Sequence, residues 1–367
     1  MRKKIYLDNA ATTPLCESCL AKIQEYAAFY YNASSANENS FMIKQEIEEC
    51  RQKIAKLINC DPEEIFFTSG ASESNSWAID GFLKAQTRDY YRVISTNIEH
   101  ASIMNNPNLS GLIECDKDGI VRPEQFEGYR NCLFCVGLAN NEIGTVQPIE
   151  KISEVIHRHG RNYLFVDATQ AFTKVNIDVK KMNIDMMSAS GHKIGALKGV
   201  GWLYVNKNVT LYPIIYGAQE NAFRGGTYNY LGIKSLFMAL DEVENTRKIA
   251  ALRNYLANTL IRMCPNIKIN GHRVNRLPGN LNICIKNIDI DSQQLVALLD
   301  MNGFVVSGGS ACHAGDPMAS YVLKAIGLSD KEANQSIRIT LGAQNTKEEI
   351  DAFIECLVNI IDMYKSA

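Results

Sequence analysis

Short apolar runs alternate with longer helical patterns along most of the 367-residue chain. Amphipathic spacing predicts helices over SESNSWAIDGFLKAQ (72–86) and IEKISEVIHRHG (149–160). Strand-and-helix alternation predicts an α/β fold with a largely parallel sheet, in which ligands bind beyond the carboxyl ends of the strands. Functional residues are therefore expected directly after the strands. The runs predicted as strands are EIFFTSG (64–70), YRVISTN (91–97), NCLFCVGLA (131–139), YLFVDA (163–168), IDMMSAS (184–190) and GWLYVN (201–206).

The pattern changes after Gly232. Residues 233–263 contain no strong helix breaker, and this predicts one continuous helix. The shorter runs that follow predict a smaller α+β unit. We therefore expect a large domain over residues 15–250 and a smaller domain formed by residues 1–14 and 251–367, with the N-terminal arm packed on the smaller one.

The composition favours a soluble globular protein rather than a nucleic-acid-binding or membrane protein. The hydrophobic share is 46%, charged residues make up 21%, and the formal net charge is −2, without a long basic block. No apolar run is long enough to span a bilayer. The basic start of the chain is not followed by the apolar stretch of a signal peptide. We therefore expect a cytoplasmic protein with no direct nucleic-acid partner and no membrane association.

Eleven cysteines are more consistent with reduced thiols than with a disulfide framework in a chain of this kind. Two Cys-x-x-Cys pairs occur, Cys16/Cys19 and Cys132/Cys135. A zinc site would need histidines at matching spacing, and the six histidines are widely scattered. We expect no metal site and interpret both pairs as buried or half-buried thiols.

A lysine follows the strand-like run IDMMSAS, in the sequence Ser190-Gly191-His192-Lys193. An amine at the mouth of a sheet can form a Schiff base if burial or cationic neighbours keep it partly neutral. A lone lysine at such a place is more often a surface residue. Its interpretation therefore depends on three further features.

The first feature is the turn from Thr68 to Asn75, whose small residues let backbone N–H groups approach an anion. The second is Asp167, which follows the apolar strand YLFV and needs a cationic partner such as a protonated pyridine nitrogen. The third is His100, which could stack on a flat ring and move protons. The simpler alternatives are a helix cap, a structural ion pair and an ordinary loop histidine.

The longer motifs resemble the signatures of one family, the cysteine desulfurases, which are fold-type I enzymes dependent on pyridoxal-5′-phosphate (PLP). This resemblance implies a large domain with a mainly parallel seven-stranded sheet and a smaller α+β domain. The motifs are YLDNAATTP (6–14), FTSGASESN (67–75), EH (99–100), NNEIGTVQPI (140–149), VDATQA (166–171), SASGHK (188–193), RGGT (224–227), SGGSAC (307–312) and SIRITLG (336–342).

Carried over position by position, the resemblance implies a role for each candidate residue. Lys193 would hold PLP as a Schiff base, His100 would stack on its ring, Asp167 would face the pyridine nitrogen and Gln170 the ring oxygen. Asn141 and Arg338 would bind the substrate carboxylate, although the alternation in SIRITLG would also allow Arg338 on the wet face of a strand. The residues expected to bind the phosphate are Ala71, Ser72, Ser190, His192 and, from the partner subunit of a homodimer, Thr227.

Cys312 lies among glycines and small residues, a context that predicts a mobile loop. The resemblance implies that its thiolate takes sulfur from L-cysteine, giving L-alanine and a persulfide. His313 beside it is a solvated loop residue or a charge that lowers the pKa of the Cys312 thiol.

The sulfur acceptor is not readable from the sequence. An iron–sulfur scaffold or a tRNA-thiolation enzyme would fit, and transient ligation of an iron–sulfur cluster by Cys312 stays open. The alternatives are a selenocysteine lyase or an aminotransferase on the same fold, or a sulfur-transfer scaffold without catalysis.

Overall fold

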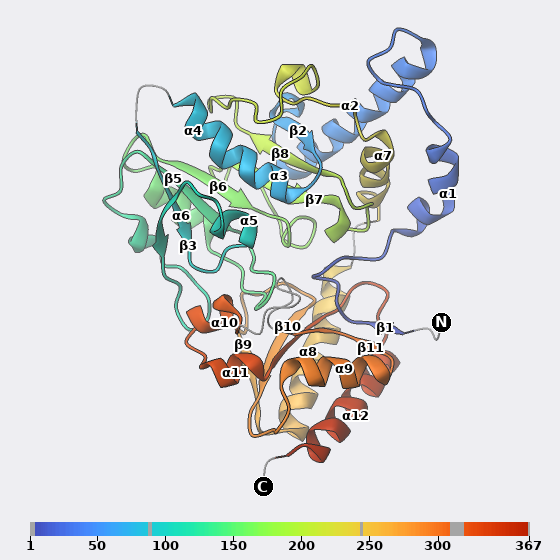
Figure 1. Ribbon diagram of the computed structural model, residues 1–367, viewed down its shortest axis with the longest axis vertical. Coiled ribbons are helices and arrows are strands. Elements are labelled where there is room, and N and C mark those ends of the chain that lie inside the picture. The colour runs from blue at the N-terminus through green and yellow to red at the C-terminus, as the bar shows by residue number, and fades with distance from the viewer. Residues whose placement is uncertain (1–3, 87–89, 243–244, 309–318, 366–367) are drawn as a thin grey trace.

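The computed structural model describes residues 4–86, 90–242, 245–308 and 319–365. Its larger part is built on a seven-stranded sheet, shown in the upper half of Figure 1. β8 runs antiparallel to both of its neighbours, and the other neighbouring pairs are parallel. The predicted seven-stranded, mainly parallel sheet is confirmed, and β4 is the strand that the sequence pattern missed. In spatial order the strands are β2 (Ile65–Thr68), β8 (Gly201–Val205), β7 (Met186–Ser190), β6 (Tyr163–Asp167), β5 (Cys132–Gly137), β3 (Arg92–Thr96) and β4 (Leu109–Ile113).

Helices cover both faces of this sheet, because successive side chains of each strand point to opposite sides. In β5, Phe134 packs in the apolar cluster that includes α2, α6 and α7. The next residue, Cys135, packs on the other face with η2, α4 and α5. The helical elements of this part are α1 (Glu17–Ala27), α2 (Glu38–Ile58), α3 (Ala71–Ser76), the π-helical turn η2 (Trp77–Gly81), α4 (Phe82–Ala85), α5 (Ala101–Met104), α6 (Ile149–Ile156) and α7 (Tyr230–Ala239), with 3₁₀ turns η1 (Pro62–Glu64), η3 (Pro123–Phe126), η4 (Gly191–Lys193) and η5 (Glu220–Ala222).

The smaller unit contains a four-stranded antiparallel sheet in the order β12-β13-β10-β9. The N-terminal arm joins it through β1, which pairs in parallel with β11, and Leu7 is fully buried in its core. This part of the arm therefore packs on the smaller unit, and the expected domain division itself stays a prediction. The elements are β1 (Ile5–Tyr6), α8 (Thr246–Met263), β9 (Ile267–Asn270), β10 (Asn280–Ile285), α9 (Ser292–Met301), β11 (Phe304–Val305), β12 (Ser307–Gly308), α10 (Tyr321–Ala325), α11 (Asp330–Asn334), β13 (Ser336–Thr340) and α12 (Lys347–Met363).

The single helix predicted over residues 233–263 is wrong. α7 ends at Ala239, and a second helix, α8, begins only at Thr246. Asn245 is the N-cap of α8, and its side chain accepts a hydrogen bond from the Lys248 N–H at 3.1 Å. An asparagine cap competes with continuation of the preceding helix, which explains a break without glycine or proline. The expected domain boundary after residue 250 falls within α8 and stays a prediction.

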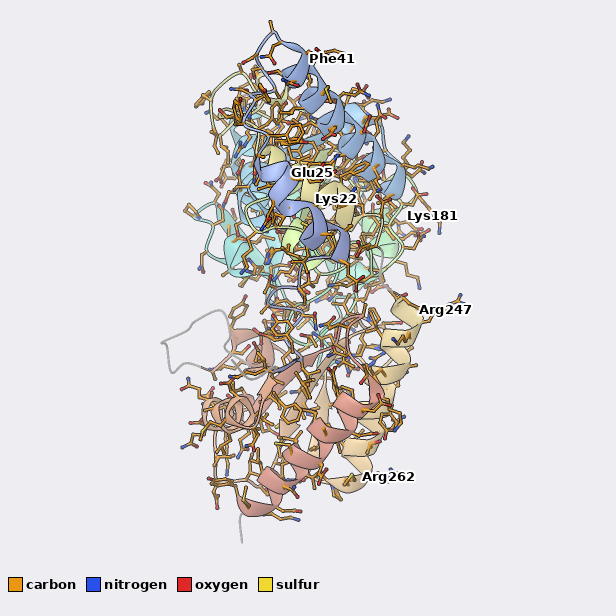
Figure 2. All side chains as sticks on the ribbon, turned by 90° about the vertical axis from the view of Figure 1, so that its right-hand side faces the viewer. Lys22, Glu25, Phe41, Lys181, Arg247 and Arg262 are labelled. Atoms are coloured by element: carbon orange, nitrogen blue, oxygen red, sulfur yellow. The ribbon has the colours of Figure 1, made fainter. Side chains whose placement is uncertain are left out.

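α8 runs along the smaller unit, with Arg247 and Arg262 near its two ends (Figure 2). Lys22 and Glu25 on α1, and Phe41 on α2, lie on the outside of the larger unit in the same view. None of the helices within the described ranges is both long and apolar enough to cross a membrane.

Candidate active site

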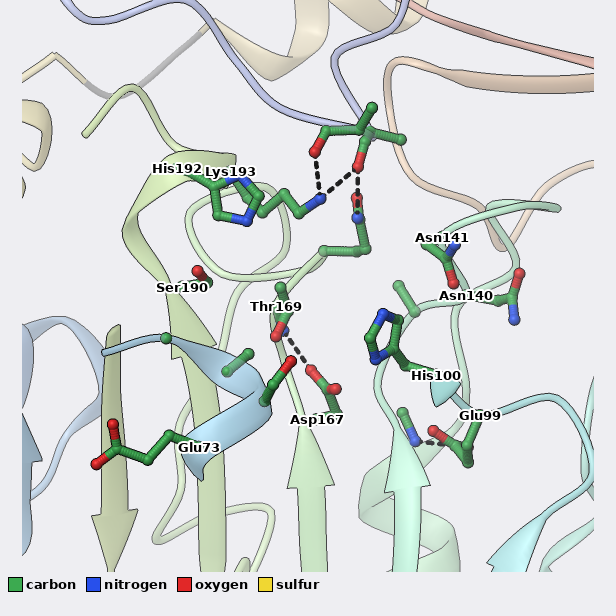
Figure 3. A pocket seen from close by; sticks show the side chains of 18 of the residues that line it. Glu73, Glu99, His100, Asn140, Asn141, Asp167, Thr169, Ser190, His192 and Lys193 are labelled. Carbon is green, nitrogen blue, oxygen red and sulfur yellow. Dashed lines mark hydrogen bonds between the residues drawn. The ribbon is translucent and has the colours of Figure 1, made fainter. Parts of the chain in front are cut away.

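A cavity of about 510 Å³ opens where the strands of the large sheet end, and Figure 3 shows it from close by. The segments after β2, β3, β5, β6 and β7 form its walls, while the N-terminal arm and β13 of the smaller unit close it. Its volume is typical of small-molecule sites. The predicted site residues that line it are Ala71, Ser72, His100, Asn141, Asp167, Gln170, Ser190, His192, Lys193 and Arg338.

Two predicted residues are not part of this lining. Thr227 is exposed and does not line the cavity of its own chain. Cys312 falls within 309–318, outside the described residues.

Lys193 ends the turn η4, directly after β7. Its Nζ donates hydrogen bonds to the carbonyl oxygens of Ala10 and Ala11, each at 2.7 Å. Figure 3 shows this amine under the N-terminal arm. The arm therefore fixes the amine at the cavity wall.

Asp167 ends β6 and is held by neutral donors. One oxygen accepts from the Thr169 N–H at 2.9 Å, and the other accepts from Asn75 Nδ2 at 2.9 Å. Asn75 is fully buried and accepts in turn from Ser188 Oγ at 2.6 Å. No cationic side chain of the described residues forms an ion pair with this carboxylate, so its charge is available to a cation in the cavity.

Two histidines stand on different sides of the cavity (Figure 3). His100 is the N-cap of α5, and its Nδ1 accepts from the Ser102 N–H at 3.2 Å. His192 Nδ1 lies 3.1 Å from Thr12 Oγ1. Burial, followed by the charges of neighbouring lysines, lowers the pKa of His192 to about 4. His192 is therefore neutral at pH 7.

The turn after β2 consists of small residues, and an acidic residue beside it forms an ion pair with an arginine. A Cβ on Gly201 would lie 2.6 Å from the Cα of Gly70, so these two backbones touch. Glu73 accepts from the Ser69 N–H at 2.8 Å and forms an ion pair with Arg224 at 2.7 Å. This leaves a small-residue cradle next to Ser190 that an anion can enter.

Arg338 comes into the cavity from β13 of the smaller unit. Its side chain is only 3% exposed, which excludes the alternative of a wet strand face. One terminal nitrogen donates to Asp8 at 2.8 Å, and the other donates to the Asn141 carbonyl at 3.2 Å. Its Nε has no partner among the described residues. The planar guanidinium is suited to bind a carboxylate.

These residues fit PLP in their chemistry. Lys193 offers the amine, Asp167 the unpaired carboxylate and His100 a flat ring. The turn around Gly70 offers a cradle of small residues, in which a Cβ on Gly70 would lie 3.7 Å from Ser190 Oγ. In the same order, these four features suit the aldehyde, the pyridine nitrogen, the aromatic face and the phosphate of PLP.

Sequence reasoning missed several polar residues of the site. Asp8, Asn75 and Glu99 lie inside the motifs described above, but their positions next to Arg338, Asp167 and the cavity needed the fold. Burial raises the pKa of Glu99 to about 7, and Glu99 accepts from Thr96 Oγ1 at 2.5 Å. Lys198 lines the cavity from the loop after η4. Further polar residues of the lining that were not predicted are Ser69, Glu73, Asn140, Gln147 and Thr169.

Comparisons with known proteins show which family the chain belongs to. The family model for class-V aminotransferases matches residues 5–353. A cysteine desulfurase IscS of Clostridium botulinum is 36% identical over 380 residues, which cover 98% of this chain and 95% of the relative. A solved structure described as a NifS-like protein has a TM-score of 0.90 at 29% identity, over 98% of this chain and 100% of that one.

A second solved structure, described as SspA in complex with cysteine, has a TM-score of 0.81 at 32% identity, over 93% of this chain and 99% of that one. The family model and these relatives extend over nearly the whole sequence. The chain belongs to the cysteine desulfurase family of class-V aminotransferases.

Proposed function

We propose that this protein uses PLP to remove sulfur from L-cysteine, giving L-alanine and a persulfide on Cys312. The observation that carries the proposal is the convergence of the Lys193 amine, the Asp167 carboxylate and the Arg338 guanidinium on one cavity. A related structure that contains cysteine supports the choice of substrate.

The cavity residues divide the work of holding PLP. Lys193 would hold it covalently, Asp167 would pair with its pyridine nitrogen, His100 would cover its ring and Gln170 would face its ring oxygen. Ala71, Ser72, Ser190 and His192 would bind the phosphate. When bound, PLP supplies an aldehyde that captures amines and a ring that accepts electrons from the substrate α-carbon.

The remaining chemistry belongs to side chains of this protein. Asn141 and Arg338 would bind the substrate carboxylate, and the Lys193 amine, once released, would move the α-proton. The Cys312 thiolate would attack the substrate sulfur, forming an S–S bond while the carbon–sulfur bond breaks and the carbon gains a proton. In sum, one cysteine and one thiol become one alanine and one persulfide.

The assembly and the acceptor are part of the same proposal. A homodimer would place Thr227 of each subunit at the phosphate of the other. The persulfide would pass, in the cytoplasm, to an iron–sulfur scaffold or a tRNA-thiolation enzyme. The role of Thr227 is supported by its position, because Thr227 is exposed and does not line the cavity of its own chain.

The test supplies L-cysteine to the purified holoenzyme and measures alanine, sulfide and the mass of the Cys312 peptide. We expect equal amounts of alanine and sulfide with a thiol reductant present, and a mass increase of one sulfur on Cys312 without it. Cys312→Ser should abolish sulfide release, whereas Cys115→Ser, which changes a half-buried thiol away from the cavity, should not.

Three other outcomes identify the alternatives. Full activity of Cys312→Ser on an amino-acid and keto-acid pair would indicate an aminotransferase. A strong preference for selenocysteine would indicate a lyase for that substrate. A protein that binds no PLP would be a scaffold without catalysis.

A further inference from the structure

We propose that Lys198 is a further phosphate-binding residue, whose ammonium supplies the positive charge that neutralises the phosphate of PLP. This inference rests on the proposed function, because it concerns the same cavity. It assigns a task to a residue that neither the motifs nor the predicted phosphate ligands include.

The predicted phosphate ligands carry no positive charge. Ala71 contributes only backbone, while Ser72 and Ser190 contribute neutral groups. Burial and the neighbouring lysines lower the pKa of His192 to about 4, which disfavours a positive charge on its imidazole. A phosphate ester carries up to two negative charges at this pH, and neutral donors alone compensate such a charge incompletely in a partly buried site.

Three other cations at or near the cavity already have tasks. Arg224 is paired with Glu73 through two nitrogens, at 2.7 and 3.0 Å. Arg338 is paired with Asp8 at 2.8 Å. Lys193 donates to two carbonyls and is the expected point of covalent attachment. None of these three charges is therefore available to a phosphate.

Lys198 is the lining cation that remains. It lies in the loop between η4 and β8, is exposed, and lines the cavity together with Gly199 and the turn after β2. Within the described part of the chain, no carboxylate lies within ion-pair distance of its ammonium.

The proximity of Lys198 to the phosphate cradle has a separate line of support. Its positive charge is one of the influences that lower the pKa of His192, after burial and Lys193. The ammonium of Lys198 therefore lies within effective electrostatic range of a residue expected to touch the phosphate. A long, flexible ammonium suits this task, since it acts on a phosphate as a point charge.

The test compares PLP with pyridoxal, which has the same ring and aldehyde but no phosphate. The apoenzymes of the wild type, Lys198→Met and Lys198→Arg are titrated with each compound, and the absorbance of the lysine adduct is followed. We expect Lys198→Met to weaken PLP binding by about 10-fold to 100-fold, the usual range for losing a charged hydrogen-bond partner. Pyridoxal binding should stay within about twofold, and Lys198→Arg should restore most of the PLP affinity.

Lys22→Met, on the outside of α1, is the matched control and should bind both compounds like the wild type. Unchanged PLP affinity in Lys198→Met would overturn the inference. Equal weakening of PLP and pyridoxal would also overturn it, because the lysine would then act on the loop and not on the phosphate. A wild-type apoenzyme that binds neither compound would instead overturn the proposed function.

Discussion

At the scale of single residues, Asp167 depends on a neighbour that cannot reach the cavity contents itself. Asn75 is fully buried and donates to Asp167 at 2.9 Å and to Ser102 Oγ at 2.8 Å. It also accepts from Ser188 at 2.6 Å. Because one amide serves three partners, it fixes the direction of the carboxylate.

Asn75→Ala should therefore destabilise the protein. The substitution removes the amide donor of one Asp167 oxygen and the acceptor of Ser188 Oγ, and each such loss costs about 1–3 kcal/mol. We expect the free energy of unfolding in urea to fall by about 2–4 kcal/mol, together with weaker PLP binding. Asn208→Ala, at an exposed asparagine after β8, should change the free energy of unfolding by less than about 0.5 kcal/mol. Equal free energies of unfolding for the two variants would show that the hydrogen bonds of Asn75 do not stabilise the fold.

At the scale of elements, hydrogen bonds to two loops tie α10 to the cavity wall. Ser320, its N-cap, donates to Glu142 at 2.6 Å. Tyr321 donates to the carbonyl of Glu99. Val322 and Leu323 pack against Ile143 in one apolar cluster. These contacts join the segment that follows Cys312 to the loops that carry His100 and Asn141.

Glu142 makes this connection pH-dependent. Burial raises its pKa from 4.5 to about 7, although Ser320 and Arg338 act in the opposite direction. Between pH 4.5 and about 7, the Glu142 carboxyl therefore keeps its proton in the folded state but has lost it in the unfolded state. Stability therefore falls as pH rises from about 4.5 to about 7, by up to about 3 kcal/mol, and then levels off.

Glu142→Gln should remove this slope, and urea unfolding between pH 5 and 8 measures it. The difference in unfolding free energy between wild type and variant should change with pH in that window. The exposed Glu355→Gln is the control for replacing a carboxylate at the surface. A difference for Glu142→Gln that does not change with pH would mean that the Glu142 carboxyl is already ionised in the folded protein.

Elements with a clear local signal were predictable, and elements that depend on distant partners were not. The strand runs around Phe134 and Phe165 carry their own apolar pattern. β4 is half exposed and edges the sheet, so its pattern is weak. The N-cap Asn245 marks the start of α8, but the apolar pattern continues on both sides of it. The sequence pattern therefore does not reveal the break between the two helices.

At the scale of the whole molecule, the cavity is assembled from the two units. The carboxyl ends of the parallel strands supply Asp167 and Lys193, while the smaller unit supplies Arg338. Several motifs contain residues that line the cavity, because these motifs lie where strands of the large sheet end; Arg338 instead lies within β13. They could not predict the ion pair of Arg338 with Asp8, whose partners are 330 residues apart.

The proposed homodimer makes a prediction that a single chain cannot test. If Thr227 binds the phosphate in the cavity of the partner subunit, Thr227→Val and Lys193→Ala should inactivate the enzyme for different reasons. Thr227→Val should weaken PLP binding by about 10-fold or more, and Lys193→Ala removes the attachment point. In a mixed dimer, the Thr227→Val subunit keeps its own Lys193 and receives Thr227 from the other subunit.

One site of each mixed dimer should therefore be intact. Co-expression of the two variants with different affinity tags, followed by tandem purification, isolates the mixed dimer. We expect about half of the wild-type rate of alanine formation at a PLP concentration where neither parent variant is active. A mixed dimer as inactive as its parents would place Thr227 in the cavity of its own chain, and a protein that purifies as a monomer would remove the trans arrangement altogether.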